Sequence, residues 1–359
     1  VASFFIYSHI SLGQVYPGQM DSTFVPVRSH HYDPELTFDF CVNEPAWSNQ
    51  AGIHSAFGST DRLYFRKEVP VNHDNDLSSS YSTTVWRGER ANAQILVWSS
   101  EALEQVRVST QDLRSAEGNI IPKDRITFEL VRYVLSNYPY AEKKAICGES
   151  PYKSGFLMPD RFETLDRFDL PSQTTRPVWM MVDVPRGTAP GTYKGQVEVR
   201  AKGKAPQLLN LEIVVQNQLL PYPKDWKYRL DLWQNPWAVA WYNHVEPWSP
   251  EHKMLLKQHL KHYADAGGTY ITTYGVHSPW SDNSYMIEGG MIEWIKKADG
   301  TWAFDYKIFD EYVELAMECG INEAITLYTP IPWGFRHRYK DEATGDYSYI
   351  NWAPSSEEF

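Results

Sequence analysis

The pattern of apolar residues changes at a proline-rich segment, 221–225. Before it, short runs alternate apolar and polar residues, as in 193–200, which is typical of strands with one buried and one solvated face. After it, strand-length runs alternate with helical patterns such as 250–265, which favours a parallel α/β sheet or barrel. Two prolines two residues apart cannot continue a central strand, so 221–225 is interpreted as a linker between two domains.

The chain of 359 residues is long enough for two domains, each with its own core. The predicted segments are a signal-peptide remnant or disordered stretch over 1–20, a β-sandwich over 21–222, and an incomplete (β/α)8 barrel of the TIM type over 223–359. The fold class predicted from the sequence is therefore multidomain, β plus α/β, with the barrel truncated.

Only about three βα units are predicted after the linker, with strands at 228–235, 270–274 and 324–328. Helices are predicted from the N-cap Ser249 to Gly267 and from Asp305 to Gly320. A complete (β/α)8 barrel takes roughly 250 residues, whereas 134 residues run from Trp226 to Phe359. We therefore expect the sequence to be a fragment of a longer protein.

Polar and aromatic residues gather where the predicted strands end, which is where α/β barrels carry their chemistry. The candidate substrate-binding residues are Asp231, Trp233, Gln234, Asn235, Trp237, Tyr274, His277, Trp280 and Trp333. Asp231 and Asn235 offer polar groups, and the four tryptophans offer flat ring faces, to a ligand bound at this end of the barrel. The alternative is that these residues only close the end of the barrel.

Aromatic residues make up 14% of the chain, and ten of the 14 tryptophans lie from residue 226 onward. Indole faces stack on the C–H faces of sugars, so this density indicates a carbohydrate ligand. A large aromatic core is the competing explanation.

Charge and motif content exclude several classes of function. The formal charge is −11 and no Lys/Arg-rich run occurs, so we expect no nucleic-acid partner. Three widely spaced cysteines favour neither a disulfide framework nor a zinc site, and no dinucleotide, P-loop or zinc-protease motif is present. We therefore predict no cofactor and no metal. No apolar run approaches the ~20 residues of a membrane span, and oligomeric state stays open.

The first residues, 2–7 and 11–14, look like the tail of a secretory signal without its basic region. They predict a secreted, periplasmic or cell-surface protein. An ordinary first strand is the alternative.

Three segments together resemble glycoside hydrolase family 123 and related uncharacterised proteins of gut bacteria. They are 86–90, with the sequence Trp-Arg-Gly-Glu-Arg, the proline-glycine hairpin 185–195, and 230–236, with the sequence Leu-Asp-Leu-Trp-Gln-Asn-Pro. The resemblance covers most of the chain from about residue 80 to its end.

The resemblance implies an exo-acting β-N-acetylgalactosaminidase with an N-terminal sandwich and a (β/α)8 barrel. It also implies a retaining mechanism in which the 2-acetamido oxygen of the sugar attacks the anomeric carbon, an exception to the scheme with a carboxylate nucleophile. Tyr274 and His277 are then candidates for contacting the acetamido group.

An adjacent Asp-Glu pair serves this mechanism in the family and follows the strand after the third. That strand is expected beyond Phe359, so no catalytic residue is assigned and the chain alone is predicted to be inactive. The pairs Asp310-Glu311 and Asp341-Glu342 are interpreted as a solvated helix face and a charged loop. The alternative function is a non-catalytic carbohydrate-binding or glycan-capture protein, and a purely structural module ranks third.

Overall fold

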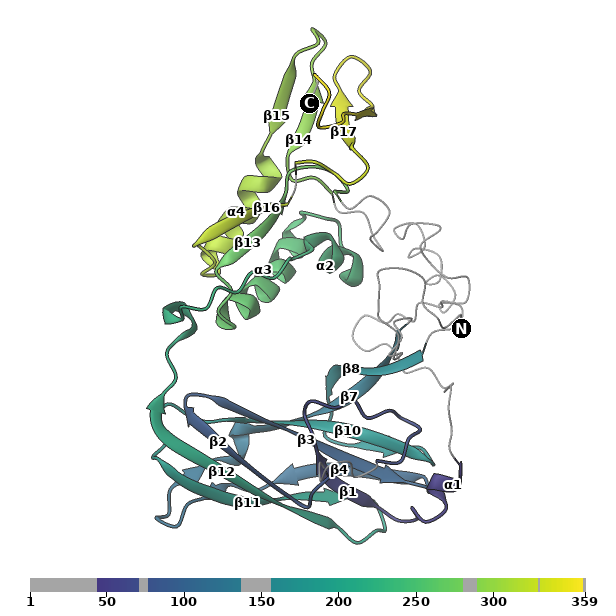
Figure 1. Cartoon of the computed structure of the whole chain (residues 1–359), viewed down its shortest axis with the longest axis vertical. Coiled ribbons are helices and arrows are strands. Elements are labelled where there is room, and N and C mark those ends of the chain that lie inside the picture. The colour runs from purple at the N-terminus through teal and green to yellow at the C-terminus, as the bar shows by residue number, and fades with distance from the viewer. Residues whose placement is uncertain (1–43, 71–76, 137–155, 280–288, 329, 358–359) are drawn as a thin grey trace. The chain divides into compact units, whose positions relative to one another are not determined.

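The computed structural model describes residues 44–70, 77–136, 156–279, 289–328 and 330–357. The described chain divides into two compact units at Leu220 and Pro221 (Figure 1). The predicted signal segment 1–20 and the candidate Trp280 lie outside the described residues.

Two β-sheets build the N-terminal unit (Figure 1). One has the strand order β1-β3-β10-β7-β8, with β1 at His54–Gly58, β3 at Arg90–Ser99, β10 at Thr174–Asp183, β7 at Ile126–Ser136 and β8 at Phe156–Thr164. The other has the order β2-β12-β11-β4-β9, with β2 at Ser80–Arg87, β12 at Gln207–Leu219, β11 at Gly191–Arg200, β4 at Leu103–Thr110 and β9 at Phe168–Leu170. The short strands β5 (Leu113–Arg114) and β6 (Ile120–Ile121) pair with each other, and β5 also pairs with β11.

One hydrophobic core joins the inner faces of both sheets. Ile95 and Val182 from the first sheet and Val197 and Ile213 from the second are fully buried in it. β11 and β12 alternate buried and more exposed positions along part of their length, as expected where one face meets the core. The two sheets sharing this core form a β-sandwich. A short helix, α1 (Glu44–Trp47), and a 3-10 turn, η1 (Lys123–Arg125), complete the unit.

The described residues of the C-terminal unit form three helices and two small sheets after the 3-10 turn η2 (Pro223–Asp225). The helices are α2 (Pro236–Asn243), α3 (Pro250–Asp265) and α4 (Lys307–Glu318). One sheet is a parallel pair of β13 (Tyr270–Tyr274) and β16 (Ala324–Tyr328) (Figure 1). The other is mixed and has the order β15-β14-β17-β18, with β15 at Trp302–Asp305, β14 at Glu293–Lys296, β17 at Arg336–Asp341 and β18 at Tyr347–Asn351. No helix in the described part of the chain is long and apolar enough to span a bilayer.

The predicted truncated (β/α)8 barrel is wrong. Within the described residues, only β13 and β16 form a parallel pair of the expected kind, and the larger sheet of the C-terminal unit is mixed. β17 includes residues 338–341 of the segment 338–342, which was expected to be a charged loop.

The predicted first strand, 228–235, is absent because side chains take over its backbone hydrogen bonds. The Tyr263 hydroxyl lies 2.7 Å from the Leu230 carbonyl oxygen and accepts the Leu232 N–H at 3.3 Å. Gln234 Oε1 accepts the Thr272 N–H of β13 at 2.8 Å. A single bridge between Leu230 and Gly268 is the remaining ladder contact of this segment. The segment therefore lies beside β13 without being a strand.

Gly268 gives the Tyr263 ring the room that this arrangement needs. A Cβ atom at Gly268 would overlap ring carbons Cε2 and Cζ of Tyr263. Gly268→Ala is therefore expected to lower the free energy of unfolding by about 1.5 kcal/mol through overpacking. Chemical unfolding followed by fluorescence measures this, with Gly187→Ala as control, because no atom lies within 4 Å of a Cβ at Gly187. Equal stability of the two variants would contradict the expectation.

A buried histidine connects α2 to α3. Ser249 caps α3 by accepting the His252 N–H at 3.2 Å, and Pro250 occupies the first turn. The His252 ring accepts the Trp248 N–H on Nδ1 at 2.8 Å, so Nε2 carries the proton and donates to the Pro236 carbonyl oxygen at 2.9 Å. His252 is fully buried, and burial lowers its pKa, which keeps the imidazole neutral.

Candidate functional site

Aromatic side chains meet where β13 and β16 end. Tyr274 and Tyr328 are the last residues of the two strands and are register partners, with ring centroids 6.2 Å apart. Trp233 packs edge-on against Tyr328 at 5.2 Å and is 61% exposed. We call Trp233, Tyr274 and Tyr328 the strand-end cluster. It presents an accessible indole that packs on the partly buried Tyr328, which in turn packs on the buried Tyr274, an arrangement suited to stacking on a sugar ring.

Asp231 lies beside this cluster. Its Oδ2 atom accepts a hydrogen bond from Thr326 Oγ1 of β16 at 3.0 Å, while the residue as a whole is exposed. The threonine therefore fixes the direction of a carboxylate that remains accessible to solvent. Such a carboxylate can accept hydrogen bonds from sugar hydroxyls.

Gln234 and Asn235 hold the backbone of this segment. The Gln234 carbonyl oxygen accepts the Tyr274 hydroxyl at 2.6 Å, and its side chain binds the Thr272 N–H. Asn235 caps α2, since its Oδ1 accepts the Ala238 N–H at 3.2 Å. These polar groups therefore position the segment that carries Asp231 and Trp233.

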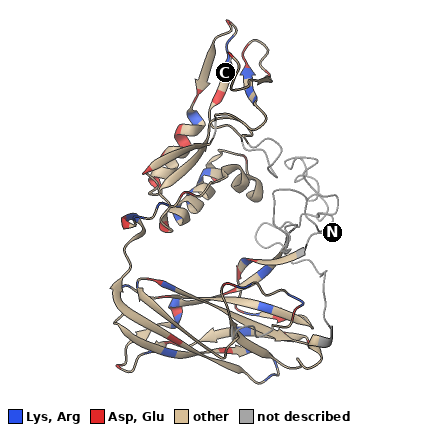
Figure 2. Cartoon of the chain, in the orientation of Figure 1, with Lys and Arg blue, Asp and Glu red and all other residues tan. Residues whose placement is uncertain are grey.

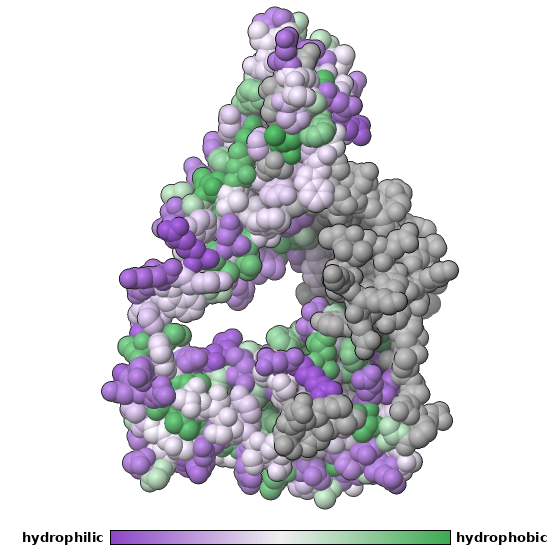
Figure 3. Space-filling model, viewed as in Figure 1, coloured by the Kyte–Doolittle hydropathy of each residue, from purple (hydrophilic) through white to green (hydrophobic). Residues whose placement is uncertain are grey.

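The remaining candidate tryptophans differ in exposure. Trp237 is 8% exposed and packs edge-on against Trp248 at 5.5 Å and Tyr274 at 5.4 Å, so it belongs to the core. Trp333 is 57% exposed, and its backbone N–H donates to the Pro279 carbonyl oxygen at 2.8 Å. Exposed apolar side chains also occur on β16, and green areas reach the surface of this unit in Figure 3.

His277 follows β13 and is neutral at pH 7. Burial, followed by the positive charges of Arg338 and Arg336, lowers its pKa to about 4. In the described part of the protein, its buried Nδ1 atom has no hydrogen-bond partner. A neutral imidazole can donate or accept one further hydrogen bond.

The two adjacent Asp-Glu pairs serve local structure. Glu311 Oε2 accepts from Lys253 Nζ at 3.0 Å, and Glu342 Oε1 accepts from Lys297 Nζ at 2.9 Å, which together with the Ala298 N–H lowers the pKa of Glu342. Asp341 caps a turn through the Ala343 N–H. These engagements are typical of structural carboxylates rather than of a catalytic acid.

Tyr328 is the member of the site that sequence reasoning missed. Burial raises the pKa of its hydroxyl. Its position at the end of 324–328 matches that of Tyr274 at the end of 270–274, and this shared position is the signal that would have identified it.

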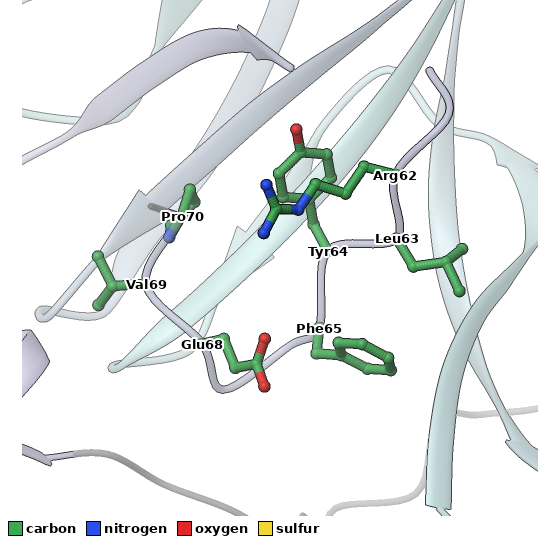
Figure 4. Close-up of a pocket in the computed structure, with 7 residues that line it drawn as sticks. All are labelled: Arg62, Leu63, Tyr64, Phe65, Glu68, Val69 and Pro70. Carbon is green, nitrogen blue, oxygen red and sulfur yellow. The ribbon is translucent and has the colours of Figure 1, made fainter. Parts of the chain in front are cut away.

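Two cavities are defined by described residues. One, of about 270 Å³, is in the N-terminal unit, where Figure 4 shows Arg62 extending across the Tyr64 ring near Glu68. The other, of about 400 Å³, is in the C-terminal unit and is lined by Pro247, Trp248, Lys253, Gly290, Met291, Glu293, Asp305, Lys307, Ile308 and Glu311. Ligand pockets typically span roughly 300–1,000 Å³, so the second cavity is the better candidate.

Carbohydrate-binding proteins often combine exposed and buried aromatic side chains with an oriented carboxylate, as found here at the strand ends. Comparison with family models agrees: the glycoside hydrolase 123 N-terminal domain matches residues 57–201 and the glycoside hydrolase 123 catalytic domain matches residues 233–359. The chain belongs to glycoside hydrolase family 123.

A solved family 123 glycoside hydrolase from Clostridium perfringens, from a study of glycolipid glycan hydrolysis, is 24% identical and aligns with a TM-score of 0.75. The alignment covers 86% of this chain and 53% of that chain, so the chain spans about half the length of this relative. At this identity the likeness shows a shared fold.

Two further alignments are much weaker. A PapD-like domain of human CEP192 is 12% identical, with 52% of this chain and 100% of that chain covered at a TM-score of 0.23. A Bacteroides ovatus GH5 xyloglucanase is 10% identical, with 72% and 45% covered at a TM-score of 0.20. Scores this low support no structural argument. The curated proteins include no significant match to this sequence.

Proposed function

We propose that this chain supplies the sugar-binding part of a glycoside hydrolase that releases terminal β-linked N-acetylgalactosamine, or a related hexosaminide, from glycans. The observation that carries the proposal is the strand-end cluster with Asp231 held beside it by Thr326. Family membership supports the reaction class. The Clostridium perfringens relative, studied for glycolipid glycan hydrolysis, supports a glycan as substrate.

The proposed mechanism is retaining and substrate-assisted, so the 2-acetamido oxygen of the sugar attacks the anomeric carbon. In this proposal Trp233 stacks on the sugar ring and Asp231 accepts hydrogen bonds from its hydroxyls. The neutral His277 ring offers one hydrogen bond to the acetamido group, since its Nδ1 atom has no partner among the described residues. Gln234 and Asn235 act indirectly by holding the segment in place.

Substituting Asp231 tests the proposed binding site. Asp231→Ala is expected to weaken binding of methyl β-N-acetylgalactosaminide about tenfold, because hydrogen bonds to a charged group contribute about 1.5–3 kcal/mol. Calorimetric titration measures the affinity. The matched control is Asp310→Ala, which removes an exposed carboxylate from α4 of the same unit. Unchanged affinity of the Asp231 variant would remove this residue from the site.

A second candidate function is glycan binding without hydrolysis. The observation that favours it is that, in the part of the chain the structure describes, β13 and β16 end in tyrosines and both adjacent Asp-Glu pairs have structural partners. We therefore propose that residues 1–359 alone bind the sugar without cleaving it. Release of nitrophenol from p-nitrophenyl β-N-acetylgalactosaminide by this polypeptide would refute that statement and favour the hydrolase directly.

A further inference from the structure

The mixed sheet β15-β14-β17-β18 has two chemically different faces. Side chains alternate between faces along a strand, and β17 and β18 alternate in burial accordingly. One face is a packed aromatic layer in which the His337 ring lies 5.2 Å from Trp294 and 5.9 Å from Trp352. The opposite face carries Arg336, Arg338, Lys340, Tyr347 and Tyr349, which we call the arginine–tyrosine ladder.

Each arginine of the ladder stacks on a tyrosine of the neighbouring strand. The Arg336 guanidinium carbon lies 3.7 Å from the Tyr349 ring centroid, and that of Arg338 lies 4.3 Å from the Tyr347 centroid. Both tyrosines are about half exposed, at 44% and 51%. Stacking uses the face of a guanidinium and leaves its N–H groups directed outward in its plane, a geometry that suits bidentate contacts to carboxylate or sulfate.

The ladder cations have no acidic partner in the described structure. No carboxylate from a described residue forms an ion pair with Arg336, Arg338 or Lys340, although fourteen other close pairs occur in the two units. Glu293 on the neighbouring strand β14 accepts the Tyr347 hydroxyl at 2.9 Å. Figure 2 shows the resulting basic segments on β17. A cationic strand without an acidic partner among the described residues, in a chain of charge −11, is a favourable place for an anionic ligand.

The surroundings of the ladder indicate the size and kind of that ligand. Glu293, bonded to Tyr347, also lines the 400 Å³ cavity that contains Trp248, so a pocket of ligand size adjoins the ladder. The positive charges of Arg336 and Arg338 reach His277, beside the strand-end cluster. The acidic character of the chain as a whole disfavours a long polyanion such as RNA, whereas a ligand with one or two negative groups meets little repulsion.

We propose that the arginine–tyrosine ladder is a binding site for acidic saccharides, in which Arg336 and Arg338 bind a carboxylate or sulfate group while the exposed tyrosine rings contact the sugar. This site is distinct from the strand-end cluster and would operate whether or not the chain takes part in hydrolysis.

The test measures direct binding of three small sugars to the intact chain by calorimetry. The probes are sialyllactose, which carries a carboxylate, sulfated lactose, and lactose as the neutral control. We expect at least one acidic sugar to bind about tenfold more tightly than lactose, the difference expected from one charge-assisted contact. The acidic sugar that binds more tightly identifies the anion.

The double variant Arg336→Gln/Arg338→Gln is expected to abolish this tenfold preference, with lactose binding unchanged. The matched control is Lys296→Gln, which removes a positive charge from the opposite face of the same sheet. The proposal is overturned if the double variant keeps the preference or if all three sugars bind equally. It is also overturned if a short single-stranded oligonucleotide binds more tightly than any of the sugars.

Loss of stacking in the double variant can also unfold the β17–β18 hairpin, so a second measurement uses the unmodified protein. The preference for the acidic sugar is expected to fall several-fold between low and high salt, since the contact is electrostatic and partly exposed. A preference independent of salt would contradict the proposal without any substitution. These binding measurements do not require turnover. Failure of the proposed hydrolase function would therefore leave the test of the arginine–tyrosine ladder unaffected.

Discussion

Replacing His252 by alanine is expected to lower the free energy of unfolding of the C-terminal unit by about 3 kcal/mol, since the change leaves a cavity and two backbone groups without their partner. Those groups are the Trp248 N–H and the Pro236 carbonyl oxygen. Trp248 adds to the effect, because its backbone is in the left-handed region at φ 65°, which a bulky residue adopts only when its surroundings hold it there.

Urea unfolding followed by tryptophan fluorescence measures this effect. Ten of the 14 tryptophans lie from residue 226 onward, so the signal reports mainly on the C-terminal unit. The control is His262→Ala, which removes an exposed histidine from the same helix and is expected to change stability by less than about 0.5 kcal/mol. Equal effects of the two substitutions would show that the His252 bridge does not stabilise the junction of α2 and α3.

Acidification is expected to destabilise the C-terminal unit through His277. Its pKa is about 4 in the folded protein, below the ordinary value near 6.5 of an unfolded chain, so the unfolded state binds more protons between these values. Stability therefore rises with pH in this window and is lost as pH falls from about 6.5 towards 4. Between pH 7 and pH 5, His277 alone is expected to account for about 2 kcal/mol.

Comparison with His277→Gln isolates this contribution, because other buried histidines titrate in the same direction. Burial also lowers the pKa of His252 and His337. The stability difference between pH 7 and pH 5 is expected to be about 2 kcal/mol smaller in the variant than in the unsubstituted protein. If both proteins lose the same stability on acidification, His277 is not held neutral by its surroundings.

Local signals predicted much of the regular structure correctly. Ser249, Pro250 and Gly267 marked the ends of α3, and the strand at 270–274 lies where the apolar run placed it. The alternating residues of β11 and β12 predicted a hairpin, and the two strands pair from Gly191 and Val215 to Val199 and Gln207. These elements could be predicted because caps and period-two patterns are local properties of the chain.

Structure that depends on contacts between distant side chains was not predictable in this way. The segment 228–235 has the alternation of a strand, but Tyr263 and Gln234 bind the backbone groups that a ladder would have used. The reverse error occurred at β17, where Arg338, Lys340 and Asp341 led to the prediction of a charged loop over 338–342. The apolar–polar alternation typical of a strand is not evident in this segment. The reason is that stacked arginine and tyrosine side chains, rather than apolar residues, cover one face of β17 and β18.

The positions of some candidate residues follow from the sequence, whereas their role in binding stays a prediction. Asp231, Trp233 and Tyr274 were selected from their positions at strand ends. In the structure Trp233 and Tyr274 pack against Tyr328, and Asp231 bonds to Thr326. Asn235 was selected for its amide, although Asn before Pro also predicts a helix N-cap, the contact observed with Ala238. Trp237 shows that an aromatic beside a predicted site can belong to the core.

The pairing of β2 with β12 has a consequence for how this protein is made. These strands are parallel, in contrast to the antiparallel pairs elsewhere in their sheet, and Ser82 of one bonds to Glu212 of the other across 130 positions of sequence. Such a non-local pairing is entropically costly to form and slows folding. During synthesis, β2 therefore lacks its partner strand until β12 has been translated. We expect chaperone contact to be most needed in this interval, while the edge of β2 is unpaired.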